Sequence, residues 1–406
     1  MAKILVVYPE LPLPLTHGVH LRIFHLFQEL ARRHVLELVV FKEIGEEAWE
    51  KCAHIFQRVH HIAPPAGRPR RRGSFRLSNA CYLEASYPEE FARITSTLRG
   101  IARRFEPDCI YVSPIDLAEY VAPLAGFRRV ADVVDSVSLT LLRKRRYATR
   151  GMPWRQAARY LLGWFRYRRF EAGLTASFDQ VLTISPVDRE HIRSLSPHRP
   201  EAVSDLPNGV SPSLEGWIQD AAEEPRSLIF WGNLDFSPNI TAVEFFYAQV
   251  FLPHLSGKGY RWHIVGKNPT ASILRMAEQH ESIILPGYVE DLYRYASAAA
   301  IVINPMQLGS GLKNKVIEAF ALGKLVVSNA LGMEALPQAL PGTHYVLAEQ
   351  PEEFAARIVE YSDDKPARDR IGARARELVL AHATWPRVAA AFERQLHLPG
   401  GPPRAS

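Results

Sequence analysis

The sequence predicts an α/β fold made of two Rossmann-like domains, each a doubly wound parallel sheet covered by helices. Two series of short apolar segments, rich in β-branched residues, alternate with helix-like segments along the chain. This alternation is typical of parallel strands buried on both faces. With 406 residues, the chain is too long for one ordinary core. Residues 196–216, rich in Pro, Ser and Gly, separate the two series. We therefore expect two domains facing a central cleft, over residues 1–205 and 206–380, followed by a terminal segment over 381–406.

The first domain is expected to begin with a strand at "KILVVY". Its expected strands are 3–8, 35–41, 109–113, 129–135 and 180–185. A helix is expected over 18–33, because Ile23, Phe27 and Leu30 fall on one face. Further helices are expected over 88–104, which begins at a proline, and after Ser185, a capping residue followed by a first-turn proline.

The second domain repeats the pattern. Its expected strands are 227–232, 261–266, 282–287, 299–305 and 324–328. Each is followed by turn residues and a helix-like segment. Ligands of such sheets bind outside the carboxyl ends of the strands, so we expect the functional site at those ends.

The composition of the chain bears on its cellular location and on the kind of partner it binds. No apolar run reaches the length of a membrane span, and the start of the chain is typical of a strand rather than of a signal peptide. Cys52, Cys81 and Cys109 are scattered, which favours a reducing, cytoplasmic setting and argues against a disulfide framework or a metal site. The net charge of +6 indicates an anionic partner.

The stretch "LGSGLKNKVIEAFALGK", residues 308–324, places charges at the start of an apolar helix. We expect this helix to run from Leu312 and to close at Gly323, because glycine suits a helix C-terminus. The free N–H groups of its first turn would form an anion site. Gly309 and Gly311 would let a phosphate approach the backbone closely.

Three side chains extend this interpretation. Lys313 and Lys315 add positive charge, and Glu318, one turn further on, can accept hydrogen bonds from a ribose diol. A phosphate beside a diol describes a nucleotide. The alternative is a capped helix with solvated lysines and a glutamate at its rim, because glycine-rich strand–helix turns are common.

Residues 309–336, "GSGLKNKVIEAFALGKLVVSNALGMEAL", resemble the nucleotide-sugar-binding motif of family-4-like, retaining glycosyltransferases of the GT-B fold. The similarity is to the branch that reads G-x-G-x-x-N-K-V-x-E-A. Further similar segments follow in order along nearly the whole chain, at 14–41, 178–193, 206–210, 230–246 and 375–396. The resemblance implies an acceptor-side first domain, a nucleotide-sugar-binding second domain, and a terminal helix that packs back on the first domain.

The resemblance also implies a donor site. Its residues are Gly18, Arg22, Gly287, Tyr288, Val289, Ser310, Gly311, Leu312, Lys313, Lys315 and Glu318. Glu318 would bind the ribose, and the backbone at 310–312, with Lys313, would hold the diphosphate and donor sugar. Residues 287–289 would line the base, and Gly18 would let the first-domain loop approach the donor. Arg22 is either a donor ligand or a solvated charge.

Three departures from the family pattern bear on the chemistry. Ser310 stands where many relatives carry a glutamate, and Asp135 where they often carry a histidine. The segment "GNLDFSPN", 232–239, lacks the Arg and Lys that many relatives carry after the first strand of the second domain. Phosphate charge would then be met by Lys313, Lys315 or Arg22.

The expected reaction moves a sugar from a nucleoside diphosphate to an acceptor. Fixed N–H dipoles and ammonium groups would stabilise the leaving diphosphate, at about 3–4 kcal/mol per good donor. The resemblance implies no required cofactor and no metal. We expect Lys313 and Glu318 to take part in catalysis, with Asp135 orienting the acceptor. The alternative role of Asp135 is a cap of the next helix through Ser136 and Ser138.

Residues 141–174 form a second candidate functional segment. The segment contains ten Lys or Arg residues and one acidic residue, and aromatic residues are interleaved with the basic ones. A basic aromatic helix can lie on an anionic membrane surface, which would place the protein peripherally on the inner face. The alternatives are a solvated helix and a nucleic-acid surface; the chain shows no nucleic-acid module, so no nucleic-acid partner is expected.

The favoured function is therefore a retaining glycosyltransferase. It would act on a glycan or lipid-linked acceptor in cell-surface polysaccharide biosynthesis. Two alternatives stay open: a sugar-nucleotide epimerase on the same fold, and a non-catalytic nucleotide-sugar-binding scaffold.

Overall fold

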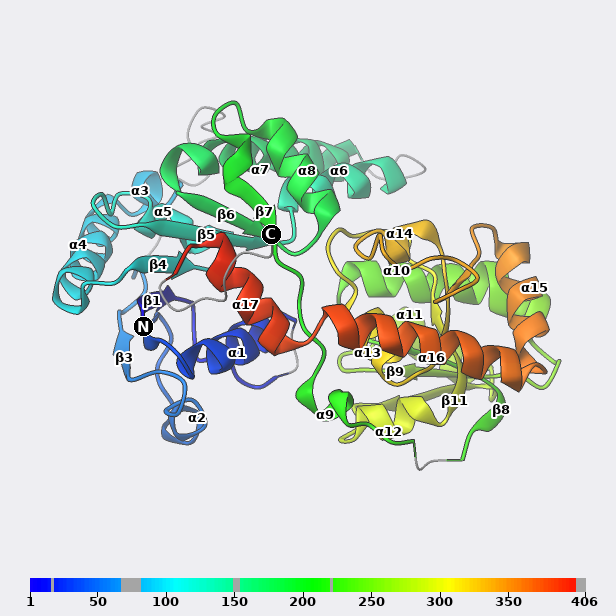
Figure 1. Ribbon diagram of the computed structural model, residues 1–406. Coiled ribbons are helices and arrows are strands. Elements are labelled where there is room, and N and C mark those ends of the chain that lie inside the picture. Colours follow the sequence, from blue (N-terminus) through cyan, green and yellow to red (C-terminus); the bar gives the residue numbers. More distant parts are fainter. Residues whose placement is uncertain (16–17, 67–81, 149–153, 220–221, 399–406) are drawn as a thin grey trace. The chain divides into compact units, whose positions relative to one another are not determined.

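The computed structural model describes residues 1–15, 18–66, 82–148, 154–219 and 222–398. Contacts divide the chain into two compact units. Unit 1 comprises Met1–Gly209 and Trp385–Ser406, and unit 2 is Val210–Thr384. Each unit is built around one sheet in which all paired strands are parallel (Figure 1).

Unit 1 holds a seven-stranded sheet in the order β3-β2-β1-β4-β5-β6-β7. Its strands are β1 Lys3–Val7, β2 Val35–Val40, β3 Arg58–His61, β4 Cys109–Val112, β5 Arg129–Val134, β6 Gln180–Thr183 and β7 Val203–Asp205. Its helices are α1 Gly18–Ala31, α2 Glu46–Glu50, α3 Tyr82–Ser86, α4 Pro88–Phe105, η1 Ile115–Leu117, α5 Ala118–Val121, α6 Val137–Ala148, α7 Trp154–Ser177, α8 Pro186–Leu195, η2 Pro200–Ala202 and α17 Trp385–Gln395.

Alternate residues of the unit 1 strands feed two cores, one on each face of the sheet. Ile4 and Val6 pack with α1 and α17, whose buried side chains include Phe27 and Phe392. Leu5 and its neighbours on the opposite face pack with α4, α5 and α8. Helix α17, at the red end of the chain, lies against α1 (Figure 1). The last helix of the sequence is thus part of the first unit.

Unit 2 holds a six-stranded sheet in the order β10-β9-β8-β11-β12-β13. Its strands are β8 Glu224–Trp231, β9 Arg261–Val265, β10 Ile283–Gly287, β11 Ala299–Asn304, β12 Leu325–Ser328 and β13 Val346–Leu347. Its helices are α9 Pro212–Glu215, α10 Ser237–Phe245, η3 Phe246–Leu255, α11 Ala271–Gln279, α12 Leu292–Ser297, α13 Asn314–Ala321, α14 Ala330–Met333, α15 Pro351–Ser362 and α16 Lys365–His382.

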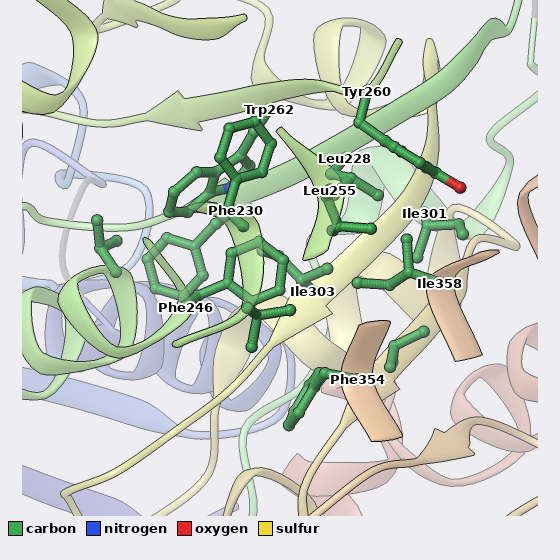
Figure 2. Packing of buried hydrophobic residues seen from close by; sticks show 14 of the residues in the cluster. Leu228, Phe230, Phe246, Leu255, Tyr260, Trp262, Ile301, Ile303, Phe354 and Ile358 are labelled. Atoms are coloured by element: carbon green, nitrogen blue, oxygen red, sulfur yellow. The ribbon is translucent and has the colours of Figure 1, made fainter. Parts of the chain in front are cut away.

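The main core of unit 2 contains a cluster of aromatic side chains among aliphatic ones. Phe230 and Trp262, from β8 and β9, pack with Phe246 and Phe354 from the covering helices (Figure 2). This core fixes β8 beside β11, where the strand order reverses direction, and such a reversal is where doubly wound sheets bind ligands.

The two parallel sheets confirm the predicted fold class. Strands β3, β7 and β13 lie outside the expected set, and each is at or next to a sheet edge. Ser185 caps α8 as predicted, its hydroxyl accepting from the N–H of Asp188.

Candidate functional site

The site begins with the turn that follows β11. Gly309 and Gly311 have φ of 111° and 72°, a region that glycine enters without steric cost. Lys313 is extended, with φ −88° and ψ 95°, so α13 begins at Asn314. The helix therefore starts two residues later than the expected Leu312, and residues 310–312 form a loop that leads into it.

Lys313 closes this loop on itself. Its Nζ donates to the backbone carbonyls of Ser310 at 2.9 Å and Gly311 at 2.8 Å, and it lies 3.8 Å from the carboxylate of Glu334. Ser310, Gly311 and Leu312 are buried. The alternative that Lys313 is a solvated lysine is therefore wrong. Its side chain is buried and holds the loop that the sequence analysis assigns to donor binding.

Lys315 is also buried, at 8% exposed. Its Nζ donates to Oδ1 of Asn239 in α10 at 2.8 Å and lies 3.7 Å from the centre of the Phe230 ring. Burial, together with the nearby Lys313, lowers the pKa of Lys315 to about 7, against the attraction of Glu318. The solvated alternative for this lysine is therefore wrong.

Glu318 lies one turn into α13 and is held from two other elements. Nε1 of Trp231, at the end of β8, donates to its Oε2 at 3.0 Å, and the hydroxyl of Tyr293 in α12 also hydrogen-bonds to it. Burial raises the pKa of the Glu318 carboxyl, and the bond from Trp231 and the charge of Lys315 oppose this rise. Two donors thus fix the carboxylate in one orientation.

Residues 287–289 follow β10 in the same unit. Gly287 has φ of 75°, Val289 is partly buried, and Tyr288 is 58% exposed. The ammonium of Lys267 lies 4.1 Å from the centre of the Tyr288 ring. An exposed aromatic ring at a strand end is a surface on which a base can stack.

The other residues that we expect to bind the sugar donor, Gly18 and Arg22, belong to unit 1. Gly18 is the first residue of α1, and its carbonyl accepts from the side chain of Asn208 at 3.5 Å. Arg22 is fully buried. Its Nε donates to Asp132 at 2.6 Å, and its Nη1 to the carbonyl of Leu206 at 2.7 Å and to Asn208 at 3.0 Å.

Burial contradicts the interpretation of Arg22 as a solvated charge. Its role as a donor ligand stays a prediction, and its Nη2 has no hydrogen-bond partner among the described residues. A buried arginine is stabilised by a buried carboxylate. Asp132, at the centre of β5, is 0% exposed and also accepts from the hydroxyl of Tyr111. The arginine links α1 to the segment 206–208, near the end of the first stretch of unit 1.

Asp135 is exposed, directly after β5. Ser136 and Glu171 cap the start of α6. Oγ of Ser136 accepts from the N–H of Leu139 at 3.2 Å, and the buried carboxylate of Glu171 accepts from the N–H of Val137 at 2.8 Å. Glu171 is a structural residue that the sequence analysis did not single out.

The basic stretch 141–174 covers most of α6 and α7, apart from residues 149–153, which lie outside the described residues. Trp154 is 75% exposed and Phe165 46% exposed. Among the helices described, none is long and apolar enough to cross a membrane. Within the described ranges, no group of His, Cys, Asp and Glu is arranged to hold a metal ion.

Two residues of this site were missed by the sequence analysis. Asn239 and Tyr293 contact Lys315 and Glu318 from α10 and α12. Trp231 is buried at the end of β8, and its indole N–H donates to Glu318. The structure thus brings Lys313, Lys315 and Glu318 together, at the point where β8 and β11 adjoin.

Comparison with known proteins defines the class. Residues 225–364 match the family model of the Glycosyl transferases group 1. This stretch contains β8, the glycine turn and α13. The chain therefore carries a glycosyltransferase group 1 domain, and it is an enzyme of the glycosyltransferase class. Among curated proteins, none matches the chain.

Solved structures match over nearly the whole length. HepE of Anabaena, in complex with UDP and glucose, is 15% identical with a TM-score of 0.66, covering 98% of this chain and 100% of that chain. A mutant of S. aureus TarM, in complex with Fondaparinux, alpha-GlcNAc-glycerol and UDP, is 10% identical with a TM-score of 0.70, covering 98% and 100%. WaaG, a glycosyltransferase involved in lipopolysaccharide biosynthesis, is 12% identical with a TM-score of 0.65, covering 98% and 100%. These likenesses confirm the predicted GT-B fold.

Proposed function

We propose that the protein is a retaining glycosyltransferase that moves a sugar from a uridine-diphosphate donor to a glycan or lipid-linked acceptor in cell-surface polysaccharide biosynthesis. The observation that carries the proposal is a buried lysine and an oriented glutamate one turn apart on α13. Lys315 provides a buried ammonium, and Glu318 provides a carboxylate oriented by Trp231. A diphosphate and a ribose diol are the ligands that these two groups suit.

In this proposal different residues bind the ribose, the base and the diphosphate of the donor. Glu318 accepts hydrogen bonds from the ribose, and Tyr288 stacks on the base. The loop 310–312, closed by Lys313, presents its backbone to the diphosphate. As the bond between the sugar C1 and the phosphate oxygen breaks, negative charge grows on the diphosphate, and fixed positive groups stabilise that charge.

The acceptor hydroxyl then bonds to C1 on the face that the diphosphate leaves. Its proton passes to an oxygen of the departing diphosphate, so the sugar keeps its anomeric configuration. The proposal gives Asp135, exposed at the end of β5, the role of orienting the acceptor. No step is assigned to Arg22, which is enclosed in unit 1.

The uridine base is proposed because the structures of HepE and TarM contain UDP. The first experiment is a thermal-shift screen of the purified full chain against UDP, GDP, ADP and TDP. A ligand at 100 times its dissociation constant stabilises by about 2.7 kcal/mol. We expect a shift with UDP that is lost in Glu318→Ala and kept in Glu278→Ala, an exposed glutamate on α11.

The stereochemistry of the reaction can be measured with UDP-glucose as the donor and water in place of the natural acceptor. Retention predicts that the glucose first released is the α anomer, observable by NMR before it equilibrates. Release of the β anomer would contradict retention. Formation of a UDP-sugar epimer would favour the epimerase alternative, and binding without any turnover would favour the scaffold.

We further propose that helices α6 and α7 bind an anionic membrane surface. The support is the exposed Trp154 and Phe165 among arginines of α7. Basic residues near such a surface contribute about 1 kcal/mol each. Co-sedimentation with vesicles of anionic lipid, lost on replacing Arg155 and Arg159 by Ala and at high salt, tests this; equal binding to neutral vesicles would refute it.

A further inference from the structure

The start of α13 adjoins the start of a second helix. Lys315 is the second residue of α13 and Asn239 the third residue of α10, and their side chains are joined by the 2.8 Å hydrogen bond. A Cβ placed on Gly309 would lie 3.5 Å from Pro238, so the glycine turn also packs on α10. Each helix start carries a partial positive charge. The ammonium of Lys315 therefore lies where two positive helix ends meet.

The partner of this ammonium is neutral. Asn239 offers an amide oxygen, and its own Nδ2 donates to the carbonyl of Asn233 at 2.9 Å. The amide also lies close to Gly232, because a Cβ placed there would lie 2.6 Å from Nδ2. Asn239 thus holds Lys315 in place without neutralising it. Burial and the neighbouring Lys313 destabilise this buried cation more than the attraction of Glu318 stabilises it.

We infer that Lys315, positioned by Asn239, is the group that neutralises the diphosphate of the donor, and that the protein takes up a proton at Lys315 when a nucleoside diphosphate binds. This inference rests on the proposed function and adds to it a positioning residue and a pH dependence. It also accounts for the segment 232–239, which carries no Arg or Lys.

The charges around Lys315 set the direction of this linkage. Burial is the main cause that lowers the pKa of Lys315 to about 7, Lys313 lowers it further, and Glu318 raises it. Phe230 and Asn239, which contact the ammonium from β8 and α10, are uncharged. A bound diphosphate favours the protonated form, so the pKa rises and a proton is taken up above neutral pH.

Isothermal titration of the full chain with UDP measures this uptake. Titrations near pH 8, in two buffers of different ionisation enthalpy, give the number of protons taken up; at this pH the terminal phosphate of UDP is already ionised. A group with a free pKa of about 7 that becomes fully charged takes up about 0.9 proton near pH 8. We expect this value for the wild type.

Variants separate Lys315 from other groups. Lys315→Met should lose the proton uptake and at least tenfold in UDP affinity, whereas Lys258→Met, which removes an exposed lysine of the same unit, should change neither. Asn239→Asp places a carboxylate beside the ammonium, which keeps Lys315 protonated before UDP binds. We therefore expect this variant to lose the uptake as well as affinity, a result that a purely structural role for Asn239 would not give.

The outcomes are distinguishable from those that test the proposed function. Tight binding of UDP by the wild type with no proton uptake near pH 8 would overturn the inference and leave the donor site intact. Uptake that persists in Lys315→Met would overturn it too, because another group would then be titrating. Absence of any UDP, GDP or ADP binding would overturn the proposed function itself.

Discussion

Lys315→Met should change how the stability of the protein depends on pH, even without a ligand. The lysine has a pKa of 10.5 when it is unperturbed and about 7 in the folded protein, where it is buried. Between these values the unfolded chain binds more protons than the native state. The free energy of unfolding contributed by Lys315 therefore rises with pH across this window and is constant below it.

The shift sets the magnitude. A shift from 10.5 to about 7 corresponds to about 5 kcal/mol between the two limits. Only part of the window is convenient for measurement, and between pH 7 and 9 the rise amounts to about 2 kcal/mol. Methionine keeps the aliphatic stem and removes the titrating group, so the difference between wild type and variant isolates this contribution.

The assay is urea-induced unfolding at several pH values from 6 to 9. Hydrogen exchange at the amides of β8 reports on unit 2 separately from unit 1. We expect the wild type to gain about 2 kcal/mol relative to Lys315→Met between pH 7 and 9, with Lys258→Met parallel to the wild type. Parallel curves for wild type and Lys315→Met would refute the reasoning, because they would mean that the buried lysine keeps an ordinary pKa.

Three further substitutions test the described contacts. Trp231→Phe removes the donor to Glu318 and should weaken UDP binding about tenfold, equal to about 1.4 kcal/mol, with kcat unchanged; an unaltered dissociation constant would count against it. Gly311→Ala forces a side chain into φ of 72° and should lower thermal stability by about 1–2 kcal/mol, whereas Gly45→Ala, at φ of −74°, should cost none; equal melting temperatures would refute this. Arg22→Met leaves a buried carboxylate unpaired and should destabilise unit 1 by about 3–5 kcal/mol in urea unfolding, and a loss below 1 kcal/mol would contradict its assigned place.

The sheets were predictable because their strands are continuous apolar runs. The segments "KILVV" and "AAIVIN" can be recognised as buried strands from their own residues, without knowledge of the strands beside them. The edge strand β3, "RVHH", has no such run, and β13 is only two residues long. Pairing with a neighbouring strand defines these edges, and the pairing partner is distant in sequence.

The site was predictable where its residues are close in sequence. The glycine turn and Glu318 fall within one motif, but Trp231 lies 87 positions from Glu318 and Asn239 lies 76 positions from Lys315. Only the adjacency of β8 and β11 brings them together. Arg22 could have been placed, because Asp132 within the apolar run "RVADVV" is a buried carboxylate that requires a cation.

The return of α17 to unit 1 has a consequence for how the chain is made. Unit 2 is one uninterrupted stretch of the sequence, whereas unit 1 is completed only by the segment from Trp385 onward. During synthesis the apolar faces of β1 and α1 stay uncovered until Phe392 and Leu396 have left the ribosome. An ion pair of Glu393 with Arg33 and a hydrogen bond of Glu393 with His34 then join the late helix to the early one. The first unit can therefore complete its core only after the whole second unit has been synthesised, and the second unit can fold before it.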